Sequence, residues 1–249
     1  MTAASFSGSA PGILIKDLHL RFGNRAIFSG INLEIPAGKT LAMLGASGCG
    51  KTSLLRIIAG LLNPDSGKIS ASDGLPIAGR MAWMGQRDLL YPWLSIIDNV
   101  MLSARLRGEK TDRPWAEYLL EQVGLENNAR ALPADLSGGM RQRAALARTL
   151  YQRAPLVLMD EPFSALDAIT RATIQTLASN LLQDRTVVLI THDPLEACRL
   201  GHHLVVLGGN PVSADASHNI SGEPPRAPDC PEVLRGQGEL LRQLMRAAG

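Results

Sequence analysis

The segment Gly45–Thr52 reads Gly-Ala-Ser-Gly-Cys-Gly-Lys-Thr, and residues of these types at this spacing can hold a polyphosphate. It fits the pattern G-x-x-x-x-G-K-S/T, which ends here at Gly50, Lys51 and Thr52. Glycines let a backbone bend closely around phosphate oxygens, so that successive N–H groups point at them. We expect Lys51 to reach the outer phosphates and the Thr52 hydroxyl to ligate a magnesium ion. The alternative is a glycine-rich turn that binds nothing.

The elements on either side of this loop favour nucleotide binding. The apolar run Thr40–Leu44 precedes the loop and predicts a strand. The apolar residues after the loop have helical spacing, and they predict a helix whose positive N-terminal end faces the same anion. These apolar residues are Leu54, Leu55, Ile57, Ile58 and Leu61. The predicted nucleotide-binding residues of the segment are Gly45, Ala46, Ser47, Gly48, Cys49, Gly50, Lys51, Thr52 and Ser53.

Two carboxylates follow a second apolar run, Leu156–Met159. Ligands of open α/β sheets sit beyond the carboxyl ends of the strands, where the phosphate loop also emerges. We therefore expect Asp160 to hold magnesium through water, and Glu161 to orient and deprotonate an attacking water. Phosphoryl transfer requires mainly positioning and charge neutralisation from the protein, and these residues can supply both. The alternative is a strand that ends in a solvated acidic turn.

His192 and Gln86 are the remaining candidates for catalysis. The run Thr186–Ile190 predicts a buried strand, and His192 lies just beyond its carboxyl end, where it could donate a hydrogen bond to the terminal phosphate or hold the attacking water. Gln86 follows the short run Met81–Met84 and is a plausible ligand of magnesium or water. A lone histidine is often structural, so the catalytic role predicted for His192 rests on its position at the end of a strand.

Ser137, Gly138 and Gly139 predict a second anion-binding helix end. Ser137 is suited to be an N-cap, and the two glycines leave backbone N–H groups open at the start of the helix. The chain already has one polyphosphate cradle. The second helix end therefore requires either another ligand or the exposed face of a nucleotide held by another molecule. The latter predicts two chains that close over two nucleotides.

The remaining pattern predicts an α/β fold with a mostly parallel sheet. The apolar runs named above and Leu204–Leu207 are short and continuous, as in strands covered on both faces. Alternating apolar residues between Ile13 and Ile35 predict an antiparallel β subdomain. Residues 88–153 show helical periodicity and predict an inserted α-helical subdomain. We expect a frayed terminus over residues 1–11, one domain over 12–209, and a tail over 210–249 with one helix at Glu232–Ala247.

Composition limits the function classes. The 249 residues are 45% apolar, which is ample for a core, and the net charge of +2 does not indicate a nucleic-acid partner. Three cysteines form no metal-spaced pair. The sequence shows neither a membrane-spanning run nor a secretory signal at its start, so we expect a soluble, cytoplasmic protein. Cys49 could be a reactive thiol at a helix N-terminus or a buried, inert one.

Together these motifs resemble the ATP-binding subunits of ABC transporters, in which they occur in the same order. The resemblance spans Ile13 to Leu207 and comprises Gly45–Thr52, Gln86, Leu136–Met140, Asp160-Glu161, Ser164–Asp167 and His192. It implies a P-loop ATP hydrolase that uses ATP and Mg²⁺. It also implies a homodimer in which Ser137–Gly139 of one subunit contacts the triphosphate of the other and Ser164–Asp167 crosses the interface. Phe22 matches the aromatic residue that stacks on adenine, although tyrosine is commoner in the family.

The resemblance also implies membrane partners. The segment Asp88–Ser95 holds several large apolar groups and matches the groove that receives a cytoplasmic helix of a membrane-spanning permease. Gln86 would then sense nucleotide beside that groove. An extracytoplasmic solute-binding protein would complete the system, and the ATPase would lie peripherally on the cytoplasmic face of the inner membrane.

Two patterns bear on the cargo. The sequence Leu-Leu-x-Pro-Trp-Leu, together with Asp98–Val100, resembles the nitrate, sulfonate and taurine importer branch. Arg199–His203, together with Phe163–Thr170, is similar to ATPases thought to serve import of hydroxymethylpyrimidine or another thiamine precursor. The first candidate for the cargo is therefore hydroxymethylpyrimidine or another thiamine precursor, and nitrate, sulfonate or taurine is the alternative, since this subunit does not touch the cargo. His202 and His203 themselves are expected to be solvated surface residues.

Two other function classes fit the sequence less well than the motor of an importer. ABC-type ATPases of DNA repair or translation usually carry a long coiled-coil insertion or two cassettes, and neither is present. A nucleotide-dependent scaffold without turnover would not need Lys51, Glu161 and His192.

The tail helix could pack on the core, assist dimerisation or contact a regulator.

Overall fold

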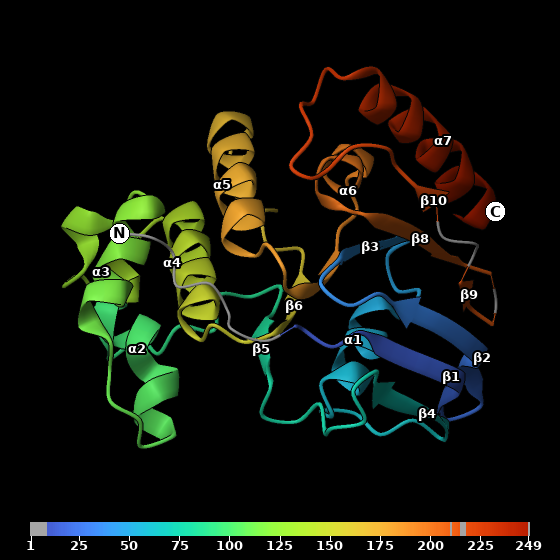
Figure 1. Ribbon diagram of the computed structural model, residues 1–249, viewed down its shortest axis with the longest axis horizontal. Helices are drawn as coiled ribbons and strands as arrows, with labels where there is room; N and C mark the ends of the chain where they lie inside the picture. The colour runs from blue at the N-terminus through green and yellow to red at the C-terminus, as the bar shows by residue number, and fades with distance from the viewer. Residues whose placement is uncertain (1–8, 210, 215–217, 249) are drawn as a thin grey trace.

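The computed structural model describes residues 9–209, 211–214 and 218–248. Two sheets meet near the middle of the molecule, and a group of helices extends from one side (Figure 1). The larger sheet has the order β10-β8-β3-β7-β6-β5, and β9 also pairs with β8. Its strands are β3 (Thr40–Gly45), β5 (Met81–Met84), β6 (Leu156–Asp160), β7 (Thr186–Ile190), β8 (His203–Gly208), β9 (Ser213–Ala214) and β10 (His218–Asn219).

The strands β5, β6, β7, β3 and β8 run parallel, whereas β9 and β10 pair antiparallel with β8. Both faces of the parallel part are buried, so successive side chains enter different cores. In β3, Leu41 and Met43 pack toward the antiparallel sheet and α1, whereas Ala42 and Leu44 pack toward α6 and α7. This arrangement explains why the predicted parallel strands are apolar without alternation.

The antiparallel sheet contains β1 (Ile13–Phe22), β2 (Arg25–Ile35) and β4 (Ser66–Ala71), in the order β2-β1-β4. Its β1–β2 register shifts between Ile15 and Leu18, and Asp17 there has a left-handed φ of 48°. This bulge explains the break in the alternation of apolar residues along β1. The strand β4 was missed by sequence reasoning, because Ser-Gly-Lys-Ile-Ser-Ala shows too little apolar pattern.

The helices are α1 (Lys51–Ile58), α2 (Ile96–Leu106), α3 (Arg113–Gln122), α4 (Gly138–Tyr151), α5 (Ala168–Leu181), α6 (Pro194–Leu200) and α7 (Pro231–Ala248). Between residues 88 and 153 the regular elements are α2, α3, α4 and two short 3₁₀ turns. These helices group together on one side (Figure 1). The fold class predicted from the sequence is therefore confirmed. None of the helices in the described residues is long and apolar enough to span a bilayer.

The tail packs on the core, which is one of the three roles considered for it. Val233 and Leu240 of α7 are buried in the same cluster as Ala42 and Leu44. A Cβ atom built on Gly208, at the end of β8, would collide with Ala247 of α7. The last turn of α7 therefore lies directly against the end of β8.

Arg226 holds the segment before α7 in place. Its side chain is 6% exposed and donates to the backbone carbonyls of five residues. The accepting carbonyls belong to Cys198, Gly201, Ile220, Ser221 and Gly222. One guanidinium group thus satisfies acceptors of α6, of the turn after it and of the tail, which joins these parts of the chain.

Three expectations from the sequence are corrected. Residues 1–8 lie outside the described part, but Ala10 is buried and the Pro11 carbonyl accepts from the Thr186 hydroxyl, so these two residues are not frayed. Leu61 lies beyond the end of α1 and is 67% exposed, because the helix ends at Ile58.

The histidine pair is also not solvated surface. The His202 side chain is 20% exposed; its Nδ1 accepts from the Thr40 N–H (3.0 Å) and its Nε2 lies 3.0 Å from Glu223. His203 Nδ1 lies 2.7 Å from Asn219 Oδ1. These contacts connect the strands β3 and β8 to the tail.

The substitution Arg226→Met should lower the free energy of unfolding by about 3 kcal/mol, because it leaves several buried carbonyls without a donor. Urea unfolding followed by circular dichroism measures this loss. The matched control is Arg235→Met, which removes an exposed arginine of α7 and should change stability by less than about 0.5 kcal/mol. Equal stability of both variants would contradict the role given to Arg226.

Candidate active site

The phosphate loop connects β3 to α1 as the sequence predicts. Gly48 and Gly50 have φ angles of 77° and 99°, which are unfavourable for residues with a Cβ atom. Gly50 is also the N-cap of α1, so the loop leads directly into the positive end of that helix. Lys51 is 8% exposed, and its Nζ donates to the carbonyls of Gly45 (2.7 Å) and Ala46 (2.9 Å).

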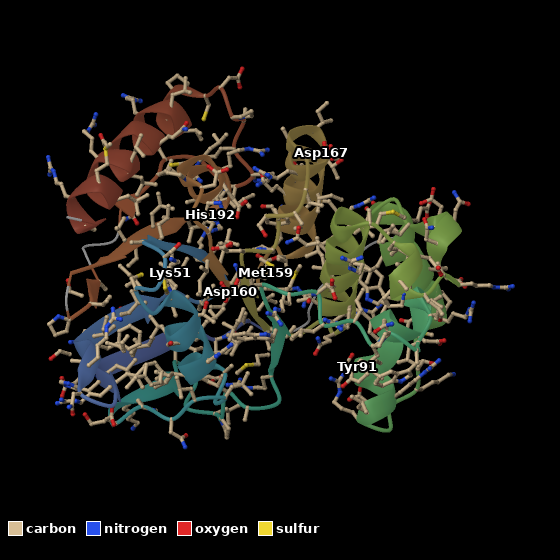
Figure 2. All side chains as sticks on the ribbon, turned by 180° about the vertical axis from the view of Figure 1, so that it is seen from behind. Lys51, Tyr91, Met159, Asp160, Asp167 and His192 are labelled. Atoms are coloured by element: carbon tan, nitrogen blue, oxygen red, sulfur yellow. The ribbon has the colours of Figure 1, made fainter. Side chains whose placement is uncertain are left out.

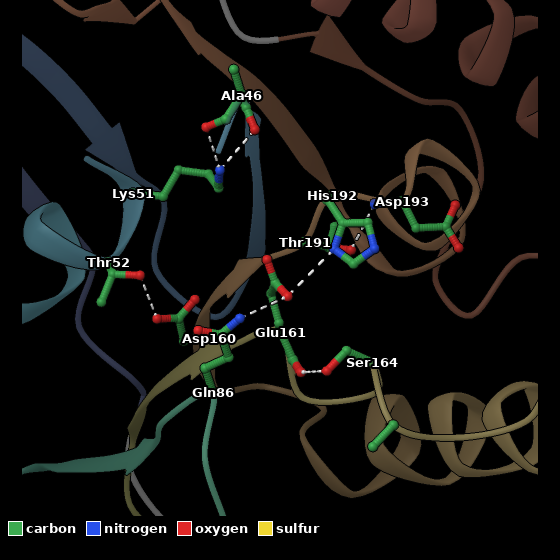
Figure 3. Close-up of polar contacts among 12 residues, drawn as sticks. Ala46, Lys51, Thr52, Gln86, Asp160, Glu161, Ser164, Thr191, His192 and Asp193 are labelled. Carbon is green, nitrogen blue, oxygen red and sulfur yellow. Dashed lines mark hydrogen bonds and ion pairs between the residues drawn. The ribbon is translucent and has the colours of Figure 1, made fainter. Parts of the chain in front are cut away.

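Thr52 and Asp160 meet across the site. The Thr52 hydroxyl at the start of α1 donates to Asp160 Oδ2 at 2.7 Å (Figure 3). Asp160 is 3% exposed at the carboxyl end of β6. Burial raises the pKa of this carboxyl, and the hydrogen bond from Thr52 acts in the opposite direction. A buried carboxylate beside a hydroxyl is a favourable pair of oxygen donors for a hard cation.

Glu161 is the point on which two other predicted residues converge. Its Oε2 accepts from Gln86 Nε2 at 3.3 Å and lies 3.4 Å from His192 Nδ1. Gln86 and His192 reach this oxygen from different sides, as Figure 3 shows. The sequence placed these three residues at the ends of separate strands, and the structure brings them together.

The backbone of Glu161 is held in an unusual conformation. Its φ is 49°, in the left-handed region that residues with a side chain rarely adopt. Its N–H donates to the Ile190 carbonyl (2.9 Å), and its own carbonyl accepts from Gln142 and Ser164, each at 3.1 Å. Such strain persists only where the surroundings fix it, and it is frequent at functional sites. Gln142 of α4 was missed by sequence reasoning.

Lys51, Thr52, Gln86, Asp160 and Glu161 line one cavity of about 350 Å³, called here the first cavity, whereas His192 is not among its lining residues. Figure 2 shows Lys51 and Asp160 near the centre of the molecule, where the two sheets meet. The lining of the first cavity consists of Ser47, Gly48, Gly50, Lys51, Thr52, Ser53, Gln86, Asp160 and Glu161. The cavity therefore combines a cationic and N–H-rich side with a carboxylate side.

The donor set fits magnesium. No group of three or more His, Cys, Asp or Glu side chains suited to a metal is found in the described residues. Magnesium does not require such a cage, because it is usually held by one or two carboxylates with water and substrate phosphate. Thr52, Asp160 and Gln86 offer a hydroxyl, a carboxylate and an amide in the first cavity.

A second cavity of about 410 Å³ lies on the other side of the phosphate loop and shares Ser47 and Gly48 with the first. Its other lining residues include Ala46 and Cys49 of the loop, Arg25, Ala26 and Ile27 of β2, and Leu207, Gly208, Gly209, Val212, Arg246 and Ala247 from β8 onward. Sequence reasoning missed this cavity, because its walls come from distant parts of the chain.

Of the predicted nucleotide contacts, Gly45, Phe22 and Ser137–Gly139 lie outside both linings. Phe22 is 53% exposed at the end of β1, near Arg25 but not among the residues of the second cavity. Ser137, Gly138 and Gly139 begin α4, and the Ser137 hydroxyl caps that helix by accepting from the Met140 N–H. Ser137 and Gly138 are exposed. Within one chain they are not part of the cavity that Lys51 lines.

The loop after Gln86 carries an exposed apolar patch, here defined as Leu89, Tyr91 and Trp93. Trp93 is 72% exposed and packs edge-on against Tyr91, with ring centroids 5.4 Å apart. Tyr91 lies in the helical part of the molecule, apart from Lys51 and Asp160 (Figure 2). The patch is anchored, because Asn99 exchanges hydrogen bonds with both the N–H and the carbonyl of Tyr91.

Comparison with known proteins identifies the family. The family model described as ABC transporter matches residues 28–164, more than half of the chain. An uncharacterized ABC transporter ATP-binding protein of Haemophilus influenzae is 41% identical over 237 residues, covering 93% of this chain and 98% of the relative. The chain belongs to the ABC transporter family.

Further similarities agree with this assignment. The aliphatic sulfonates import ATP-binding protein SsuB 2 of Burkholderia cenocepacia is 41% identical and covers 96% of this chain and 90% of the relative. A solved dimeric ATP-binding cassette, MJ0796, in a post-hydrolysis state with ADP and phosphate, matches with a TM-score of 0.74 and 28% identity. That match covers 84% of this chain and 99% of the cassette. As an ATP-binding cassette, the chain binds ATP and is an ATPase.

Glu196 of this ATPase is buried just beyond the active-site edge of β7. It is 5% exposed, its Oε2 accepts from Gln175 Nε2 (2.9 Å), and its Oε1 has no hydrogen-bond partner among the described residues. Burial raises the pKa of Glu196 to about 7; the nearby Asp193 carboxylate adds to this, while Thr191, Gln175 and Arg171 oppose it.

This burial should make stability depend on pH. The pKa of Glu196 is near 4.5 when exposed and about 7 when folded, so its contribution to stability is largest below pH 4.5 and is lost as the pH rises to 7. The Glu196→Gln side chain stays neutral, so the variant should not show this loss. Between pH 5 and pH 7 the free energy of unfolding of the wild type should therefore fall by roughly 1–3 kcal/mol relative to that of the variant. Urea unfolding at several pH values tests this expectation.

The exposed Glu34→Gln variant is the control and should follow the wild-type profile. If Glu196→Gln and the wild type show parallel pH profiles of stability, Glu196 does not titrate in this window.

Proposed function

We propose that this chain is the ATP-hydrolysing motor of an ABC importer, acting as a homodimer with a separate permease. The observation that carries the proposal is the convergence of Gln86 and His192 on the Glu161 carboxylate, beside the Thr52–Asp160 pair. A scaffold that only binds nucleotide would not need a carboxylate held in this way next to a phosphate loop.

The residues of the first cavity divide the work of hydrolysis. Backbone N–H groups of the phosphate loop and Lys51 bind the phosphates, which releases Lys51 from the carbonyls that it now contacts. Thr52, Asp160 and Gln86 would hold Mg²⁺, which neutralises charge on the phosphates when bound. Glu161 orients the attacking water and accepts its proton at a carboxylate oxygen. His192, which is 65% exposed beside Glu161, donates a hydrogen bond to the terminal phosphate.

The homodimer would complete each site. The exposed start of α4 presents Ser137, Gly138 and Gly139 with backbone N–H groups suited to an anion, yet these residues lie outside the first cavity of their own chain. A second copy is the simplest source of the missing phosphate contact, and Ser164–Asp167 would lie at the same interface. The similar cassette MJ0796 is dimeric, which supports this arrangement.

The permease would dock on the patch of Leu89, Tyr91 and Trp93. Large apolar side chains exposed together are typical of a protein interface. The same loop begins at Gln86, so nucleotide contact and permease contact would be separated by a few residues. The protein would then lie peripherally on the cytoplasmic face of the inner membrane, and the permease would receive solute from an extracytoplasmic binding protein. No feature of the charge favours nucleic acid.

The relatives favour an aliphatic sulfonate as the imported solute. Several of them are named for sulfonate import, and two of these are 41% and 40% identical to this chain. Import of hydroxymethylpyrimidine is the second candidate. It rests on the pattern Arg199–His203 together with Phe163–Thr170. Nitrate and taurine belong to the same branch as the first candidate.

Glu161→Gln should retain ATP binding and lower the rate of hydrolysis by about 10²- to 10⁴-fold, because the site keeps its geometry but loses the base. The variant should also accumulate as an ATP-bound dimer. Steady-state phosphate release and size-exclusion chromatography with ATP measure both effects. The control is Glu121→Gln, an exposed position of α3. Wild-type turnover by Glu161→Gln would rule out the role of Glu161.

Deletion of the gene should reduce uptake of radiolabelled aliphatic sulfonate by whole cells about tenfold or more. Complementation with the wild-type gene should restore uptake, and Lys51→Ala should not, because binding of the phosphates is lost. Labelled hydroxymethylpyrimidine is tested in parallel. If only its uptake falls, the sulfonate assignment is wrong and the second candidate holds. If neither uptake changes, the proposed cargo classes are both wrong.

A further inference from the structure

The second cavity contains two arginines that no part of the mechanism above uses. Arg25 comes from β2 and Arg246 from the last turns of α7. Both side chains are exposed, and neither makes an ion pair or a side-chain hydrogen bond within residues 9–209, 211–214 and 218–248. Two guanidinium groups more than 200 positions apart in the sequence therefore line one cavity, and their donors are available to a ligand.

The packing of α7 against the core sets the position of Arg246. Val233 and Leu240 anchor α7 in a buried cluster. Ala247, next to Arg246, lies so close to Gly208 that no larger residue than glycine fits there. The end of β8 thus fixes the last turn of α7 at the wall of the second cavity.

The cavity walls suit the flat, partly apolar end of a nucleotide. Ile27, Leu207 and Val212 supply apolar surface, and Ser47 and Gly48 connect this cavity to the one that Lys51 lines. A triphosphate bound in the loop must extend its sugar and base away from Asp160 and Glu161. A guanidinium group can stack on a purine ring or donate to sugar hydroxyls.

We propose that Arg246 of the C-terminal helix lines the nucleotide site and contacts the nucleoside part of bound ATP. This inference rests on the proposed binding of a nucleotide at Gly45–Thr52, and it makes α7 a part of that site. The tail then serves two purposes: it covers β3 and β8, and it supplies a positioning residue for ATP. Bound ATP in turn stabilises the last turn of α7.

The test compares ATP with inorganic tripolyphosphate as ligands of the purified full chain, measured by isothermal titration calorimetry in the presence of Mg²⁺. Arg246→Gln should weaken ATP binding by about three- to tenfold, as expected for one lost charge-assisted contact at an exposed position. Binding of tripolyphosphate should stay within twofold of the wild type. The control Arg242→Gln, one turn earlier on the same exposed side of α7, should leave both affinities unchanged.

Equal ATP affinities of Arg246→Gln and Arg242→Gln would overturn the proposal. So would an equal loss of affinity for ATP and tripolyphosphate, because that result indicates a general effect of charge on the phosphates. Lys51→Ala separates this inference from the proposed function. If the wild type fails to bind ATP, or if Lys51→Ala binds it equally well, nucleotide binding at the loop itself is wrong.

Discussion

The parallel pairing of β3, β7 and β6 is the constraint on which the active site depends. Beyond the strand ends, the Thr191 N–H still donates to the Met43 carbonyl (3.2 Å), and the Glu161 N–H donates to the Ile190 carbonyl (2.9 Å). These bonds extend the sheet ladder into the loops. The phosphate loop, the two carboxylates and His192 therefore leave the sheet at one edge. Without this register, their separation in sequence would give no common site.

Much of this arrangement could be predicted because its determinants are local. The runs Leu156–Met159 and Thr186–Ile190 are apolar at every position, and both strands are buried on both faces. The N-cap of α4 could be predicted in the same way, since Ser137 is followed by a helix-forming segment. Once the strands are known to be parallel, the rule for ligand sites in open sheets places Glu161 and His192 near the phosphate loop.

The remainder depends on contacts that no local pattern encodes. Strands of two residues, such as β9 and β10, exist because β8 offers an edge to pair with, and their own residues have no strand pattern. His202 is held by Thr40 and Glu223, and Arg246 reaches the second cavity only because Ala247 fits against Gly208. In each case the partner lies far away in the chain, and for His202 residue type alone suggested a solvated surface.

The loop between Gln86 and the apolar patch is fastened to α4. Asp88 accepts from Arg141 through its side chain (3.0 Å) and from Arg148 through its carbonyl (2.6 Å), while the Leu89 carbonyl also accepts from Arg148 (2.7 Å). Arg141 lies only four positions after Ser137. Two arginine side chains of one helix thus tie the loop that carries the patch to the element that begins at Ser137, so both surfaces belong to one packed unit.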